Sequence, residues 1–392
     1  MDKFDFVRTE LEALKASGLY GTMRTVESAQ GAWITVDGRK VLNLCSNNYL
    51  GLANSPMLKR AVRKNMAQHG IGAGAARLIS GTHTLHVQFE KALSRFKKTD
   101  DCLFFASGWC ANIGTIQAIT GSGDVIFSDE LNHGSLIDAS RLSRAKTVVY
   151  QHRDFSHLRR VLKEADDARR KLIVTDGVFS MDGDLAPLPE IVQLAEEHKA
   201  LVMVDDAHGE GVLGDHGRGI VDHFGLHGKV DIEMGTMSKA FGVIGGYIAG
   251  RAEFIDFMRH KARTSLLATA PTLIDVAACL AAINVVEESE RLVKKLWSNT
   301  TFFKKSMQSL GFDIGHSETP IIPVMVKDER RAQEFEEDLF KQGIFAHAIV
   351  YPTVPKGEAR LRVQISAVHK RDDLKYALDK LDAIGHRLGV PA

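Results

Sequence analysis

The feature that most constrains the fold of this 392-residue chain is a regular alternation between about residues 101 and 250. Short apolar runs there are separated mostly by segments with helical periodicity, such as Leu158–Ala165 and Pro189–His198. Runs that are apolar throughout are typical of strands buried on both faces of a parallel sheet. The alternation therefore predicts an α/β domain around a mainly parallel central sheet. The expected strands are Cys102–Ala106, Val125–Ser128, Thr147–Tyr150, Leu172–Thr175, Leu201–Val204 and Gly246–Ala249.

The pattern changes after Gly250, which predicts a second, smaller α+β domain. Residues 252–310 have helical periodicity, and the tail then mixes expected strands at 321–326 and 361–366 with expected helices at 332–342 and 372–388. Two short strands near the start, 33–36 and 40–44, are expected to pack with this domain. We therefore divide the chain into an N-terminal segment 1–48, a large domain 49–285 and a small domain 286–392.

The charge balance and the cysteines exclude several classes of function. With 50 basic and 49 acidic residues, the net charge of +1 gives no electrostatic reason to expect a nucleic-acid or membrane partner. No apolar run is long enough to cross a bilayer, and the first fifteen residues lack the apolar core of a signal peptide. The four cysteines are scattered, without zinc-ligand spacing. We therefore expect a reduced, cytoplasmic protein with no metal site.

The strongest chemical feature is a lysine flanked by hydroxyl residues and glycines. Residues 235–242 read GTMSKAFG, so that Lys239 follows Thr236 and Ser238. A lysine there is poorly placed as a surface charge. Lysine amines form imines with aldehydes, and pyridoxal 5'-phosphate (PLP) is the aldehyde cofactor that proteins hold in this way. We therefore expect Lys239 to carry PLP, with the Thr236 hydroxyl available to its phosphate.

An aspartate at the end of a buried strand fits the same cofactor. PLP withdraws electrons well only if its ring nitrogen stays protonated, and a buried carboxylate can hold that proton. Asp205 continues the expected strand 201–204 and lies 34 residues before Lys239, while His208 follows three residues later and could bond the 3'-oxygen of the cofactor. Alone, this group would be read as a capping aspartate pair at the start of a loop.

Other strand ends supply further candidates, each with a simpler structural explanation. Ser107, Gly108 and Trp109 stand between a strand and a helical run, where free backbone amides can bind a phosphate, although a tight turn also needs the glycine. His133 could stack on the pyridine ring or could merely begin a helix. Ser180 is a hydroxyl near the expected cofactor, or a turn residue.

Two arginines on the last expected strand could recognise a carboxylate. Arg360 and Arg362 are two residues apart and so share one face of the strand. A guanidinium binds a carboxylate with two parallel hydrogen bonds, as an amino-acid substrate requires. Asn47 could help to hold the same carboxylate. The alternatives are a surface arginine and an Asx turn, and these residues alone do not decide between them.

Taken together, these motifs resemble the α-oxoamine synthases, the PLP enzymes that join an amino acid to an acyl-CoA. The resemblance runs from about residue 11 to residue 389. It implies the PLP-dependent transferase fold type I, the aspartate aminotransferase-like fold. The segments that carry it are SNNYLGL (46–52), RLISGT (77–82), SDELNHGSLIDA (128–139), TDGVFSMDGDLAPL (175–188), VDDAHGEGVLG (204–214), GTMSKAFG (235–242) and PTVPKGEARLRV (352–363).

The resemblance also implies residue roles and a dimer. Lys239 would be the Schiff-base lysine and would take the Cα proton, and the family's active sites lie between two copies of the chain, so a homodimer with shared sites is expected. The implied catalytic residues are Lys239, His133, Asp205 and His208. The implied cofactor residues also include Ser107, Gly108, Trp109, Ser180, Thr236 and, from the neighbouring subunit, Thr269. The implied substrate residues are Asn47, Arg77 and Arg362.

The motifs identify the two classes of substrate but not the particular compounds. The amino acid is expected to be glycine or L-alanine, and the acyl chain is not specified. Near Thr269 this chain lacks the serines and most of the prolines usual in the family, and Trp109 stands where Phe or Tyr is usual. Residues 245–247 resemble the glycine C-acetyltransferase branch, and the motif set as a whole resembles the 8-amino-7-oxononanoate synthase branch nearly as well. An aminotransferase or lyase of the same fold, or a catalytically silent partner subunit, are the alternative functions.

Overall fold

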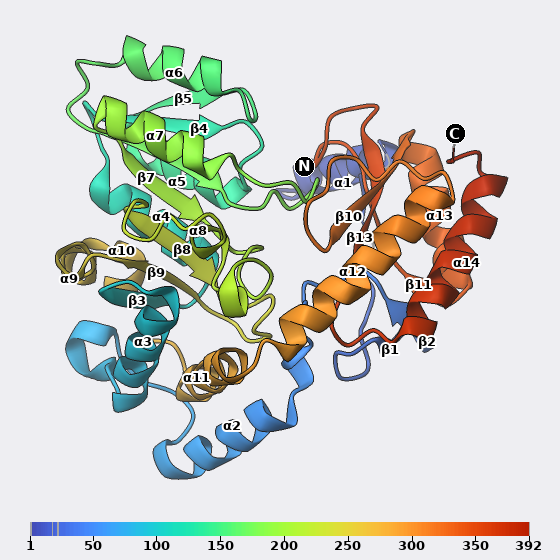
Figure 1. Ribbon diagram of the computed structural model, residues 1–392, viewed down its shortest axis with the longest axis horizontal. Helices are drawn as coiled ribbons and strands as arrows, with labels where there is room; N and C mark the ends of the chain where they lie inside the picture. Colours follow the sequence, from blue (N-terminus) through green and yellow to red (C-terminus); the bar gives the residue numbers. More distant parts are fainter. Residues whose placement is uncertain (1, 18, 22, 392) are drawn as a thin grey trace.

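The computed structural model describes residues 2–17, 19–21 and 23–391, and it forms two groups of elements joined side by side (Figure 1). The larger group surrounds a seven-stranded sheet, and the smaller group contains the C-terminal helices together with strands from both ends of the chain. Within the described part of the chain, no helix is both long enough and apolar enough to traverse a bilayer.

The seven-stranded sheet is mainly parallel, as the sequence predicts. Its order is β3-β9-β8-β7-β6-β4-β5, and β9 alone runs antiparallel to its neighbours. The strands are β3 (Asp101–Phe105), β4 (Val125–Asp129), β5 (Lys146–Tyr150), β6 (Lys171–Asp176), β7 (Leu201–Asp205), β8 (Ile232–Thr236) and β9 (Gly246–Gly250).

The continuous apolar runs arise because helices cover both faces of this sheet. Along β6, Leu172 and Val174 pack with the core that contains α4 (Gly108–Ile119), α5 (Gly134–Ser143) and α9 (Ala252–Lys261). The residue between them, Ile173, packs with the opposite core, which contains α6 (Phe155–Glu164) and α7 (Leu188–His198). Successive side chains of a strand point to opposite faces, so both sets must be apolar.

Further helices surround the sheet and connect to the small group. Helix α11 packs against α2 and α3, and short helices fill the remaining connections. Their bounds are α2 (Pro56–His69), α3 (Thr84–Lys97), α8 (Ile220–His223), α10 (Arg263–Leu266) and α11 (Leu273–Glu288), with short 3-10 turns at Leu52–Asn54 and Asp215–Gly217 and a π turn at Arg77–Gly81. Helix α1 (Asp5–Ala16) lies instead beside the small group (Figure 1).

The small group is built on two three-stranded sheets. One has the order β1-β2-β11, in which β2 pairs in parallel with β11, and the other has the order β10-β13-β12. Helices α13 and α14 pack against each other, and α14 also packs on α12. The elements are β1 (Trp33–Val36), β2 (Arg39–Asn43), β10 (Ile321–Lys327), β11 (Ile344–Phe345), β12 (His347–Ile349), β13 (Ala359–Gln364), α12 (Arg291–Ser309), α13 (Glu329–Lys341) and α14 (Arg371–Arg387).

Two details differ from the sequence expectations. Strand β8 is missing from the predicted set, because its sequence, IEMGT, contains a charged residue and a glycine. The expected division at 285/286 falls inside the last turn of α11, since the chain passes from one group to the other between α11 and α12.

Candidate active site

Three neighbouring parallel strands end in polar residues at one edge of the large sheet. Strand β6 ends at Asp176, β7 at Asp205 and β8 at Thr236, and Asp176 is opposite Asp205 in the strand register. Lys239 follows three residues after Thr236. In open α/β sheets, ligands bind at the carboxyl ends of the strands, so this edge is the expected place for a site.

A cavity of about 230 Å³ opens at this edge and brings together most of the residues that the sequence singled out. Arg362 and Asn47 lie beyond its wall, and Arg77 and Thr269 lie elsewhere. The expected residues that line the cavity are Ser107, Gly108, Trp109, His133, Ser180, Asp205, His208, Thr236 and Lys239.

Lys239 lines the cavity with its amine in a protein environment that disfavours charge. Burial lowers the pKa of Lys239, and the nearby carboxylates of Asp205 and Asp176 oppose that effect only in part. A lysine with a lowered pKa has a larger neutral fraction near pH 7, and the neutral amine is the form that attacks a carbonyl or accepts a proton.

Asp205 is fixed by two hydrogen bonds. Asn112, on α4, donates from Nδ2 to Oδ2 of Asp205 at 2.8 Å, and the backbone N–H of Ala207 donates to Oδ1 at 3.1 Å. The same Asn112 amide group donates to the Ser135 hydroxyl at 2.8 Å. Asp205 is buried but borders the cavity, so its carboxylate is held in one orientation toward whatever occupies that space.

His133 begins α5 and is oriented from both sides. Its Nδ1 accepts from the backbone N–H of Ser135 at 3.2 Å, while its own backbone N–H donates to Asp176 at 2.9 Å. Trp109 meets the imidazole edge to face, with ring centroids 6.1 Å apart. Burial lowers the pKa of His133, the Asp205 carboxylate raises it, and the Lys239 charge lowers it. The neutral imidazole is therefore favoured over the cation.

His208 is oriented by a residue that the sequence did not single out. The Tyr49 hydroxyl lies 2.8 Å from Nδ1 of His208, and the phenol is fully buried. Burial, reinforced by the charges of Lys239 and Arg362, holds the pKa of His208 well below its usual value. A neutral His208 bonded through Nδ1 keeps Nε2 free for another partner.

The opposite end of the cavity is suited to an anion. Helix α4 begins there, and the Ser107 hydroxyl caps it by accepting from the Cys110 N–H at 3.2 Å. The first amides of a helix carry partial positive charge and bind phosphates. Gly108 lets the backbone pass close to β8, since a Cβ there would come within 2.9 Å of the Met234 side chain. The cavity therefore fits PLP: its anion-binding end suits the phosphate, the buried Asp205 carboxylate suits the ring nitrogen, and the Lys239 amine suits the aldehyde.

The carboxylate-binding candidates lie together just beyond the cavity wall. Arg362, on β13, donates from Nε to the carbonyl of Ser180 and from Nη2 to Oδ1 of Asn47 at 3.5 Å. Arg360, on the same face, is buried and forms an ion pair with Asp182. Arg360 is thereby committed to its own partner, whereas Arg362 is half-buried and its contact with Asn47 is long.

Two expected residues lie outside this group. Arg77 forms a two-pronged ion pair with Glu90, both bonds being 2.9 Å, and lines a different pocket. Thr269 is exposed and forms an isolated bridge with Ala76. Neither side chain reaches the Lys239 cavity of its own chain, so the role of Thr269 would require a second copy.

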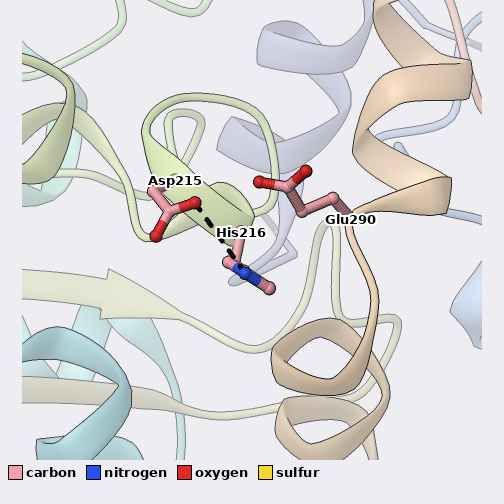
Figure 2. A group of neighbouring side chains, drawn as sticks. All are labelled: Asp215, His216 and Glu290. Atoms are coloured by element: carbon pink, nitrogen blue, oxygen red, sulfur yellow. Dashed lines mark ion pairs between the residues drawn. The ribbon is translucent and has the colours of Figure 1, made fainter.

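A cluster of possible metal ligands lies away from the cavity, at Asp215, His216 and Glu290 (Figure 2). The His216 Nε2 and an Asp215 oxygen are 3.8 Å apart. Asp215 also pairs with Arg218, and Glu290 pairs with Lys294. Each carboxylate has a cation partner, so the cluster is accounted for by surface ion pairs.

Sequence reasoning missed three residues that build the site. Asn112 had a usable signal, because it is a polar amide near the start of the mostly apolar helical run 111–119. Asp176 ends a strand, as Asp205 does, and its burial together with the charge of Asp205 raises its pKa well above the usual value. Tyr49 had no such signal, because its partner lies 159 residues away.

Comparison with known proteins agrees with this geometry. Residues 39–381 match the family described as aminotransferase class I and II. Full-length relatives are the 8-amino-7-oxononanoate synthases of Thermosipho melanesiensis (58% identical) and Fervidobacterium nodosum (56%), each match covering 100% of both chains. The 8-amino-7-oxononanoate synthase 1 of Bacillus subtilis is 47% identical, with 98% of both chains covered.

Solved structures give the same fold. A serine palmitoyltransferase from Sphingomonas wittichii superposes with a TM-score of 0.94 at 29% identity, over 100% of this chain and 99% of that one. An 8-amino-7-oxononanoate synthase from Francisella tularensis gives a TM-score of 0.77 at 26% identity, over 88% and 97%. The chain belongs to the aminotransferase class I and II family, with the PLP-dependent fold type I. Within that class it is a PLP-dependent acyltransferase of the α-oxoamine synthase family, as its motifs predict.

Proposed function

We propose that this protein is an 8-amino-7-oxononanoate synthase that condenses L-alanine with a pimeloyl thioester. The observation that carries the proposal is the desolvated Lys239 amine in one cavity with Asp205 and His133. The 46–58% identity of full-length relatives with that name supports it.

The product's structure identifies the substrates. An 8-amino-7-oxononanoate has nine carbons, with a ketone at C7 and an amine at C8. The bond formed by condensation is C7–C8. Alanine supplies C8, C9 and the amine and loses its carboxyl group as CO2, while C1–C7 come from a seven-carbon acyl thioester with a terminal carboxylate. Alanine and pimeloyl-CoA therefore yield the product, CoA and CO2, and the atoms balance.

The chain's own residues have distinct tasks in this reaction. PLP, when bound, supplies an electron sink that weakens the bonds at Cα of the amino acid. Asp205, held by Asn112, would keep a proton on the cofactor's ring nitrogen. The neutral Lys239 amine would accept the Cα proton, and the neutral His133 imidazole would lie against the ring and could return a proton.

Other residues would bind the substrate carboxylate, the cofactor phosphate and the 3'-oxygen of the cofactor. Arg362 and Asn47 would bind the carboxylate of alanine, because the half-buried guanidinium of Arg362 lies beside the Asn47 amide, at 3.5 Å. The amides of Gly108 and Trp109 at the start of α4 would hold the cofactor phosphate, together with the Thr236 hydroxyl once it turns away from the Gly245 carbonyl. Ser180 and His208 would bond its 3'-oxygen. Arg77 is paired with Glu90, so its substrate role is the weakest of these assignments.

The proposal includes a homodimer in which Thr269 of one copy reaches the phosphate of the other. Support comes from an apolar surface beside Thr269. The segment at residues 71–79 runs along residues 267–273, joined by backbone bonds such as Leu273 N–H to the Ile71 carbonyl. Exposed apolar patches of this kind mark protein interfaces. The exposed side chains in these segments are Ile71, Leu78, Ile79 and Leu267.

A cytoplasmic location is proposed from the cysteines. All four thiols are free in the structure, which suits a reducing compartment.

The test is a matrix of substrates. Purified protein is given alanine, glycine or serine with pimeloyl-, acetyl-, succinyl- or palmitoyl-CoA, and free thiol and CO2 are recorded. Alanine with pimeloyl-CoA is expected to give the highest kcat/KM, with one CO2 per thiol. Release of thiol from acetyl-CoA and glycine without CO2 would instead favour glycine C-acetyltransferase. Keto-acid formation without thiol release would show an aminotransferase, and no turnover would favour a silent subunit.

A further inference from the structure

A fully buried lysine, Lys97, lies behind the cavity, surrounded by carboxylates that the reaction does not use. Nζ of Lys97, at the end of α3, lies 3.2 Å from Glu233, 3.3 Å from Glu210 and 3.6 Å from Asp206. It also donates to the carbonyl of Arg218 at 2.6 Å. The side chains of Lys97 and of all three acids are at most 3% exposed.

Lys97 and the acids around it change one another's pKa. Burial opposes the charge of Lys97, yet Glu233 and the other carboxylates raise its pKa above the usual value. Burial raises the pKa of Glu210 to about 8 and that of Asp206 to about 7, with Lys97 opposing both. Burial thus favours the neutral form of Glu210 and Asp206, and Lys97 favours their charged form.

One carboxylate of the cluster is bonded to the wall of the cavity. Oε2 of Glu210 accepts the backbone N–H of Thr236 at 3.1 Å, at the point where β8 ends and the turn toward Lys239 begins. Thr236 in turn donates its hydroxyl to the carbonyl of Gly245 at 2.7 Å and contacts the Ser238 hydroxyl at 2.6 Å. The bond from Glu210 thus fixes the backbone from which this hydroxyl pair extends.

The Glu210 carboxylate can approach β8 this closely only because residue 235 is a glycine. A Cβ at Gly235 would lie between 2.3 and 2.5 Å from the Glu210 carboxylate. Gly235 therefore lets the carboxylate pass close to β8 and reach the next N–H, that of Thr236. Glu233, two residues earlier on the same strand, contacts Lys97 at nearly the same distance, but no bond joins it to Thr236 among the described residues.

We propose that Glu210 is a positioning residue for the cofactor site, holding the Thr236 turn in place while Lys97 holds Glu210. This inference rests on the proposed role of Thr236 at the cofactor phosphate. Loss of the Glu210 acceptor leaves a buried N–H without a partner, which weakens the fixed geometry of the turn. Glu233 shares the burial and the Lys97 contact, so it provides a matched control.

The experiment measures the Kd of PLP for the apo-protein by absorbance titration, together with the melting temperature. Glu210→Ala is expected to raise this Kd about tenfold, the size expected when one buried N–H loses its acceptor. Glu210→Gln keeps an acceptor oxygen and is expected to stay within about threefold, and Glu233→Ala within about twofold despite a comparable loss of melting temperature. Equal changes in Kd for Glu210→Ala and Glu233→Ala would overturn the proposal.

A second measurement applies if the alanine variants do not fold. Glu210→Met and Glu233→Met keep the approximate side-chain length but remove the acceptor oxygens, and hydrogen exchange of the peptide that contains Thr236 is compared in their apo forms. Faster exchange in Glu210→Met alone supports the positioning role, and equal exchange in both contradicts it. If the wild-type protein binds no PLP, the proposed function fails. If it binds PLP and the two variants behave alike, only this inference fails.

Discussion

Lys239 and Lys97 are two lysines enclosed by the same domain, and their surroundings give them opposite properties. Burial lowers the pKa of Lys239 because the nearby carboxylates compensate only in part. Around Lys97, three carboxylates and a backbone carbonyl overcome the same burial and raise the pKa. Burial alone thus does not decide whether a lysine is reactive or structural. The number and distance of its anionic partners decide it.

The largest expected effect follows from removing the reactive lysine. Lys239→Ala should lower CoA release by more than about 10³-fold, since both the cofactor bond and the proton acceptor are lost. Its melting temperature should stay close to that of the wild type, because no ion pair is broken. The control is Lys64→Ala, on the exposed face of α2, which should leave the rate unchanged. Residual turnover above a hundredth of the wild-type rate would contradict the assignment.

Removing Lys97 should mainly lower the stability of the protein, whereas removing Lys239 should mainly lower its activity. Lys97→Met leaves three buried acids without their cation and should lower the free energy of unfolding by about 3–5 kcal/mol. Denaturant unfolding measures this loss. A Lys97→Met protein as stable as the wild type would show that the carboxylates are neutral without it, and the contrast between the two lysines would disappear.

A smaller effect is expected when Asp205 loses its charge. Asp205→Asn keeps the shape and the contact with Asn112 but can no longer hold a proton on the cofactor ring. The rate kcat should fall by about 10²-fold, with a smaller change in the KM for alanine. The visible absorbance of bound PLP should also change. An unaltered kcat would remove Asp205 from the reaction.

The smallest effect concerns a third enclosed cation, His152. Burial opposes its charge, but Asp129 and Asp184, at 3.0 and 2.8 Å, raise its pKa to about 9. Its ordinary pKa is near 6.5, so its contribution to stability is complete below pH 6.5 and is lost as the pH rises through 9. His152→Gln should therefore cost on the order of 2 kcal/mol at pH 6 and much less at pH 10. A cost independent of pH would contradict this.

Much of the fold and of the cavity could be predicted, because the signals were local. The apolar runs predicted six strands of the large sheet, the residues after them indicated Asp205 and His133, and the motif at 235–242 indicated Lys239. Strand β8 was missed because Glu233 looks unsuited to a buried strand until Lys97, from far along the chain, is seen to meet it. Tyr49 and Glu90 were missed for the same reason. Only the folded structure brings them next to their partners, His208 and Arg77.

The covalent attachment of the cofactor tests the central claim most directly. The protein is incubated with PLP, treated with borohydride to reduce any imine, digested and analysed by mass spectrometry. We expect the phosphopyridoxyl group on the peptide that contains Lys239, and none on the peptide that contains Lys97. Labelling of another lysine instead, or no labelling of the folded protein, would contradict the account.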